Sequence, residues 1–156
     1  MSEKKLKNIF KHIGKKMRDN DSVVLQAVNI SGYLLQYASR RLRNDYNITL
    51  AAVQKDGWAL YYASNELKNN FNIVLEAIKN DASALQFASY ELKNNSQIVF
   101  NAVSNNGLAL QFASDLLKND KNIVEAAIQN NAGAFEYASR KLKENPEIVK
   151  LAISNV

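Results

Sequence analysis

The chain of 156 residues has no cysteine and only one proline, five glycines and one histidine. Without cysteine it forms neither a disulfide framework nor a thiolate metal site, which excludes a disulfide-stapled secreted fold and fits a reducing compartment. No apolar run approaches the roughly 18 residues of a membrane-spanning helix. The sequence therefore predicts one domain without a transmembrane segment, and we expect it in the cytoplasm.

Positive charge is concentrated at one end of the chain. There are 20 basic and 15 acidic residues in all, and seven of the basic residues stand within the first 20 positions beside only Glu3 and Asp19. From residue 21 onward the two signs balance. The net charge therefore reports on the N-terminal segment and does not by itself indicate a nucleic-acid-binding surface along the whole chain.

A repeat with a period of 25 residues runs through most of the sequence. Its most regular part is an aromatic residue followed by Ala and Ser, with a Leu three residues after the Ser. The serines of this column are Ser39, Ser64, Ser89, Ser114 and Ser139. A second column of alanines recurs at the same spacing from Ala27 to Ala152. Five periods without a gap define a tandem repeat.

Each period reads as two short helices. In the first helix apolar residues such as Ile48, Ala52 and Val53 fall on one face, and residues 59–67 make a second apolar stripe at helical spacing. A helix pair of this length cannot bury its apolar face alone, so successive pairs must stack. The predicted fold class is all-α, an α-solenoid of short helix-turn-helix repeats.

The two ends of the array differ from its middle. Residues 1–20 predict a basic amphipathic capping helix, and residues 21–156 predict five full helical-hairpin repeats plus an unpaired final helix. The apolar face expected of the capping helix consists of Leu6, Ile9, Phe10, Ile13 and Met17. The unpaired final helix leaves apolar residues uncovered, which predicts self-association through this C-terminal helix or continuation in a longer array.

One stretch resembles a known family. It reads Ile-Val-Leu-Glu-Ala-Ile-Lys-Asn-Asp-Ala at residues 73–82 and continues Ser-Ala-Leu-Gln-Phe-Ala-Ser-Tyr-Glu-Leu-Lys-Asn-Asn to residue 95. The pattern is similar to a short helical-repeat family known as a domain of unknown function, found in tandem in proteins of protists, large viruses and intracellular bacteria. The resemblance covers residues 21–156. It implies a repeat protein of an effector or host-interacting type, in the host cytoplasm in that case, and supplies no catalytic residue.

The sequence offers little for catalysis. His12 is the only histidine and falls in the aromatic column of the capping segment, where packing is the simplest interpretation. The Ser column is interpreted as structural, with Ser64 returning a hydrogen bond to the carbonyl of Leu60 within one helix. There is no Gly-rich phosphate loop and no facing pair of carboxylates. We expect no enzyme, no catalytic residues, no metal site and no cofactor.

The positions that vary on the outer side of the second helices form the candidate binding stripe. Its N-terminal half is rich in Tyr, Trp, Gln and Arg, which are frequent in binding hot spots. The candidate partner-binding residues are Tyr33, Gln36, Arg40, Trp58, Tyr61, Asn65, Gln86, Tyr90 and Gln111. The sequence thus predicts a non-enzymatic protein-interaction scaffold that binds a protein or peptide through this stripe.

An alternative is a helical repeat protein that binds nucleic acid through a basic column and the N-terminal segment. The column consists of Arg18, Arg43, Lys68, Lys93, Lys118 and Lys143. A local cause competes with this hypothesis, because a cation in the last turn of a helix interacts favourably with the helix dipole in every repeat, whatever the protein binds. The protein-binding scaffold is therefore preferred.

Overall fold

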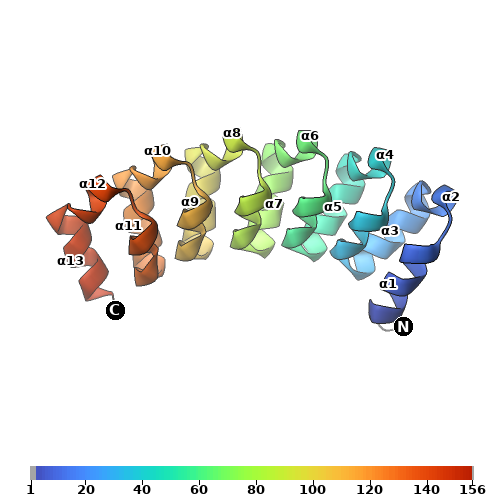
Figure 1. The fold of residues 1–156 in the computed structure, drawn as a ribbon, viewed down its shortest axis with the longest axis horizontal. Helices are drawn as coiled ribbons and strands as arrows, with labels where there is room; N and C mark the ends of the chain where they lie inside the picture. The colour runs from blue at the N-terminus through green and yellow to red at the C-terminus, as the bar shows by residue number, and fades with distance from the viewer. Residues whose placement is uncertain (1–2, 156) are drawn as a thin grey trace.

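The computed structural model describes residues 3–155, and every regular element within that range is a helix. The helices stand side by side in a gently arched row that follows the order of the sequence (Figure 1). Long α-helices form one layer, 3₁₀-helices form a second layer behind it, and short α-helices line one edge. Both termini lie on the side away from the short helices. The predicted all-α solenoid is confirmed.

Each repeat contains three kinds of helix. The long α-helices are α3 (Asp21–Ile30), α5 (Tyr46–Lys55), α7 (Phe71–Asn80), α9 (Ser96–Asn105), α11 (Lys121–Asn130) and α13 (Pro146–Ser154). The 3₁₀-helices are η1 (Gly32–Tyr37), η2 (Gly57–Tyr62), η3 (Ala82–Phe87), η4 (Gly107–Phe112) and η5 (Ala132–Tyr137). The short α-helices are α2 (Lys15–Arg18), α4 (Arg40–Arg43), α6 (Asn65–Lys68), α8 (Tyr90–Lys93), α10 (Asp115–Lys118) and α12 (Arg140–Lys143).

The long helices begin at side-chain caps and bury one face. An Asn or Asp precedes each of them and accepts a hydrogen bond from the backbone N–H three residues on, as Asp45 does from Ile48. The alanine column is closed off from solvent, and Ala52, Ala77, Ala102 and Ala127 are each 0% exposed. Small side chains at this column let the 3₁₀-helix of the preceding repeat approach the long helix closely.

The predicted second helix is in fact two helices. The backbone is extended at Ala63 and Ser64, so η2 ends before them and α6 begins after them. Ser64 caps α6 by accepting a hydrogen bond from the N–H of Leu67 at 3.2 Å. The prediction that Ser64 bonds to the carbonyl of Leu60 is therefore wrong, because the hydroxyl is used at a helix start and not within a helix.

The Ser column also joins successive repeats. Each Ser backbone N–H donates to the carbonyl of the basic residue that ends the preceding short helix, as Ser89 does to Lys68 at 2.9 Å. Each Ser hydroxyl donates to the carboxamide or carboxylate oxygen one residue further along, as Ser89 Oγ does to Asn69 Oδ1 at 2.6 Å. The five serines thus form a polar seam along the edge of the short helices.

Removing one hydroxyl of this seam tests its contribution. We expect Ser89→Ala to lower the free energy of unfolding by about 1–2 kcal/mol, because it removes both a helix cap and a bond between repeats. Urea denaturation followed by circular dichroism measures the change. Ser96→Ala is the control, because Ser96 is exposed at the start of α9 and its loss is expected to cost less than about 0.5 kcal/mol. Equal effects of the two substitutions would contradict this role.

Three of the 3₁₀-helices begin with a glycine where they meet the next long helix, namely η1, η2 and η4. A Cβ added at Gly107 would lie 2.2 Å from the carbonyl oxygen of Ala127, which is closer than real Cβ atoms come. The N–H of Gly107 also donates to Asn130 Oδ1 at 2.7 Å, and Asn130 Nδ2 donates back to the carbonyl of Ser104 at 2.9 Å. A second set of bonds between repeats therefore runs along the ends of the long helices.

The N-terminal segment continues the register of the repeat with one change. Helix α1 (Glu3–His12) takes the place that a 3₁₀-helix has in the other repeats, and Gly14 precedes α2 where Ser39 precedes α4. Phe10 is 8% exposed and packs with Ala27 and Leu34, whereas Ile9 and Met17 are 41% and 51% exposed. The side chain of Leu6 lies outside the described residues.

Candidate protein-binding surface

The geometry of the 3₁₀-helix explains the aromatic part of the binding stripe. Side chains three residues apart are eclipsed in such a helix, so Trp58 and Tyr61 point the same way from η2. Between them, Ala59 and Leu60 turn inward and are 0% exposed. Trp58 and Tyr61 are 39% and 56% exposed, so two large rings stand on the outer side of the 3₁₀ layer.

Contacts from the next repeat hold these rings in place. Phe87 of η3 meets both rings edge-on, with centroids 5.2 Å from Trp58 and 5.2 Å from Tyr61. The indole N–H of Trp58 donates to Ser83 Oγ at 2.7 Å, and that hydroxyl donates in turn to Asp81 Oδ1 at 2.6 Å. The rings are therefore fixed before any partner arrives.

The fixed rings surround an apolar pocket of about 260 Å³ that spans three repeats. The pocket is lined by Tyr33, Trp58, Tyr61, Tyr62, Gln86 and Phe87. We call it the aromatic pocket. Four of the predicted site residues meet here, and two lining residues, Tyr62 and Phe87, were missed because the sequence reasoning assigned their column to the core. Both are only half-buried.

The other predicted site residues lie elsewhere. Arg40, Asn65 and Tyr90 are the first residues of α4, α6 and α8, so the break at Ala-Ser carries them onto the edge of the short helices. Tyr90 is 75% exposed. Gln36 and Gln111 lie in η1 and η4, outside the lining of the pocket, and each amide donates to the backbone carbonyl three residues earlier. Gln86, within the pocket lining, makes the same bond in η3.

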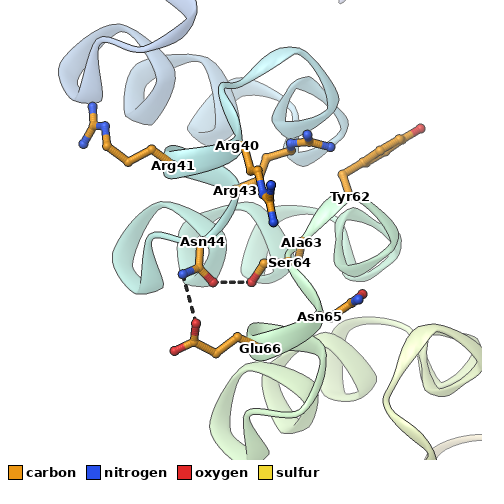
Figure 2. A pocket seen from close by; sticks show the side chains of 9 residues that line it. All are labelled: Arg40, Arg41, Arg43, Asn44, Tyr62, Ala63, Ser64, Asn65 and Glu66. Carbon is orange, nitrogen blue, oxygen red and sulfur yellow. Dashed lines mark hydrogen bonds between the residues drawn. The ribbon is translucent and has the colours of Figure 1, made fainter.

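A groove opens between α4 and α6, next to the aromatic pocket (Figure 2). It has a volume of about 630 Å³ and is lined by Arg40, Arg41, Arg43, Asn44, Tyr62, Ala63, Ser64, Asn65 and Glu66. Figure 2 shows Arg40 and Arg43 on the same side as Tyr62, with Arg41 pointing away from them and Glu66 on the opposite wall. Asn44 Nδ2 donates to Glu66 at 3.0 Å.

The same groove recurs one repeat earlier, between α2 and α4. It is about 680 Å³ in volume, and its lining consists of Lys15, Lys16, Arg18, Asp19, Tyr37, Ala38, Ser39, Arg40 and Arg41. These are the positions 25 residues before those of the first groove. We call the two together the basic grooves. The repeat period could have located them from the sequence, because short helices of the type Lys-Lys-Met-Arg and Arg-Arg-Leu-Arg occur in succession only here.

The positive charges in the grooves differ in how they are paired. Arg41 donates to Asp19 at 3.1 Å and to Asp21 at 2.6 Å. The hydroxyl of Ser39 lowers the pKa of Asp19, and Arg41 lowers it further. Lys68 is not part of the lining of either groove, and its pKa is lowered by burial and by the nearby positive charge of Arg43, which lines the first groove.

The basic column has a common structural position. Each of its residues ends a short α-helix, and the carbonyl groups of five of them accept the seam bonds from the following Ser. From Arg43 to Lys143 the side chains are half-buried. Burial lowers the pKa of Lys93 as well, which fits cations packed along the repeat edge. The residues of the basic column thus occupy the same half-buried position at the end of successive short helices.

The C-terminal end carries a separate apolar surface. Ile153 of α13 is 71% exposed, and beside it lies a pocket of about 390 Å³. That pocket is lined by Ala132, Gly133, Phe135, Glu136, Val149, Ala152 and Ile153. Self-association through this helix, or its packing against further repeats, stays a prediction.

These features define a class: an all-α tandem-repeat solenoid whose surface chemistry is concentrated between its N-terminal repeats. The chain belongs to the family described as domain of unknown function (DUF4116), whose model matches residues 4–43, 20–68, 45–93, 70–118, 95–143 and 120–156. The resemblance seen at residues 73–95 is thereby confirmed. No curated protein and no solved structure matches the chain.

Two further properties concern only the part of the chain that the structure describes. None of its helices is both long enough and apolar enough to cross a bilayer. Among the side chains that the structure describes, no three of His, Asp or Glu come together in a group that could hold a metal ion.

Proposed function

We propose that the protein is a non-enzymatic scaffold that binds a protein or peptide through the aromatic pocket and the stripe around it. The observation that supports this proposal is the pair of exposed rings, Trp58 and Tyr61, held by Phe87 and Ser83. Trp and Tyr dominate binding hot spots because they bury a large area in a partner. Side chains that are already fixed lose little conformational entropy on binding.

The repeat architecture suits this role. A solenoid presents a long surface on which each repeat contributes side chains at the same position. Only the N-terminal repeats contribute aromatic residues there; Leu108 and Gln111 stand at the positions of Trp58 and Tyr61 two repeats later. We therefore expect the partner to contact the first three repeats. We propose that this binding takes place in the cytoplasm, or in the cytoplasm of a host cell if the protein is an effector.

A peptide selection tests the proposal. Random peptides are displayed on phage, selected on the immobilised protein, synthesised and measured by fluorescence anisotropy. We expect Trp58→Ala plus Tyr61→Ala to weaken the selected peptides about 30-fold, because a hot-spot residue contributes about 2 kcal/mol or more. The matched control, Leu108→Ala plus Gln111→Ala, changes the same positions two repeats later and is expected to leave the affinity within about threefold.

Two results would contradict the proposal. One is a selection that enriches no peptide above background. The other is a set of peptides that bind the wild type and the Trp58/Tyr61 double variant equally well, since these would use another surface. Thermal melting of both double variants establishes that the fold is retained.

A further inference from the structure

The aromatic pocket and the basic groove between α4 and α6 share a wall. Tyr62 lines both, and its ring meets Tyr61 edge-on with centroids 5.1 Å apart. The ammonium group of Lys68 lies 5.5 Å from the centre of the Tyr61 ring. A ligand whose apolar part occupies the pocket therefore meets positive charge directly beside it.

The positive charge on this wall is not neutralised by the protein. Arg40, Arg43 and Lys68 form no ion pair with any side chain that the structure describes, whereas Arg41 is bound by Asp19 and Asp21. The Nε–H of Arg43 is buried and has no hydrogen-bond partner in the same part of the chain. A buried donor without an acceptor is costly, so a shift of the Arg43 side chain that brings its Nε–H to an incoming acceptor would be favoured.

Basic short helices lie beside exposed aromatic rings only around the aromatic pocket. Helix α12 is also basic, but Gly133 and Glu136 stand there at the positions of Trp58 and Tyr61. Arg40 lines both basic grooves, and Lys15 and Lys16 extend the positive surface along α2. In the next repeats the corresponding short helices carry acidic residues, Glu66 in α6, Glu91 in α8 and Asp115 in α10. The two kinds of surface therefore coincide in the first repeats only.

We infer that the partner is an acidic peptide segment with one large apolar side chain, which fills the aromatic pocket while neighbouring Asp or Glu carboxylates lie in the basic grooves. This inference rests on the proposed function, because both use the aromatic pocket. Guanidinium groups bind carboxylates through paired hydrogen bonds, so Arg40 and Arg43 are suited to this ligand. Glu66 on the far wall repels carboxylates and keeps them on the side of Tyr62.

The same observations favour a peptide over a nucleic acid. A nucleic-acid strand along the array would need exposed positive charge in successive repeats, but the basic column is half-buried, and the exposed Glu66, Glu91 and Asp115 stand on the same short helices. A compact apolar pocket beside two short basic grooves fits one anchored side chain with flanking acids.

The probe for the test is a fluorescein-labelled peptide in which Asp and Glu flank one central Leu, with Gly and Ser as spacers. One control peptide has Asn and Gln in place of the acids, and the other has Ser in place of Leu. A labelled uridine oligonucleotide and phosphatidylserine-containing vesicles complete the set. We expect the protein to bind the acidic Leu peptide about tenfold more tightly than either control peptide, with an affinity that falls as salt rises.

Charge-reversal variants distinguish binding in the basic grooves from nonspecific attraction between the acidic peptide and the basic protein. Arg40→Glu plus Arg43→Glu is expected to weaken the acidic Leu peptide at least about tenfold. Arg140→Glu plus Lys143→Glu makes the same charge change at the same positions of α12 and is expected to change the affinity less than about twofold. Because Arg43 is half-buried, Lys16→Glu plus Arg40→Glu, both exposed, provides a second variant without risk to the core.

The outcomes are distinct. Equal losses in the α4 and α12 variants, or tighter binding of the oligonucleotide or the vesicles, would overturn the inference. If the α4 variants keep the affinity while Trp58→Ala plus Tyr61→Ala loses it, the acidic ligand is wrong and the proposed function stands. If binding depends on Arg40 but not on Trp58 and Tyr61, the shared site is wrong. If neither set of variants matters, both proposals fail.

Discussion

Replacing Leu85 by Ala is expected to lower the free energy of unfolding by about 2–5 kcal/mol. Leu85 lies in η3, in the middle of the row, and is 0% exposed. Its side chain belongs to the continuous core that runs through the repeats, so we expect truncation to leave a cavity. In a repeat array each repeat contacts only its neighbours, so the weakened junction lies between two halves of the molecule. Urea denaturation measures the loss.

The control for this prediction is Leu116→Ala. Leu116 lies in α10 and is 67% exposed, so the same chemical change there is expected to cost less than about 0.5 kcal/mol. A comparable loss in the two variants would show that the core of the 3₁₀ layer does not hold the repeats together. A transition that becomes broader for Leu85→Ala would indicate that the two halves unfold separately.

Replacing Gly107 by Val is expected to have the second large effect on stability. The first side-chain carbon would overlap the carbonyl oxygen of Ala127, and both groups belong to backbone that is fixed by helices. The junction must open to admit the side chain, at the upper end of about 1–3 kcal/mol. Thermal melting of the variant beside the wild type detects the change.

Gly14→Val is the matched control, because a Cβ at Gly14 meets nothing within 4 Å. We expect it to change stability by less than about 1 kcal/mol. Ala82 stands at the position of Gly107 one repeat earlier, so a single methyl group is accommodated at that junction. Gly107→Ala is therefore expected to be milder than Gly107→Val, and a reversed order would contradict the steric explanation.

The sequence predicts the repeat and the buried columns of this fold but not the break within the second helix. Periodicity identifies which residues face the core, because Leu60, Ala63 and Leu67 keep a helical spacing whether the segment is one helix or two. Ser64 lacks the sequence signature of a capping box, since Leu67 stands where Glu or Gln would complete it. Its use as a cap depends on the bond to Asn44 in the preceding repeat, which is a tertiary contact.

The sequence predicted only part of the candidate site, because the remaining part depends on contacts between repeats. The variable positions identified Tyr33, Trp58, Tyr61 and Gln86, which come together around one pocket. Phe87 was missed because an aromatic residue that recurs in every repeat is typical of a core. In the structure it is half-buried, and its ring contacts the two rings Trp58 and Tyr61 of the preceding repeat. Side-chain contacts between neighbouring repeats cannot be predicted from the sequence pattern of a single repeat.

The polar seam also bears on how such a chain changes over generations. Each Ser caps its own short helix and donates a hydrogen bond to the repeat before it. The loss or gain of one 25-residue unit therefore leaves no unpaired donor or acceptor of the seam at the new junction. In-frame deletion or duplication in the gene would therefore alter the length of the array while the fold survives. The aromatic pocket draws on three consecutive units, and selection on binding would hold only those units in their order.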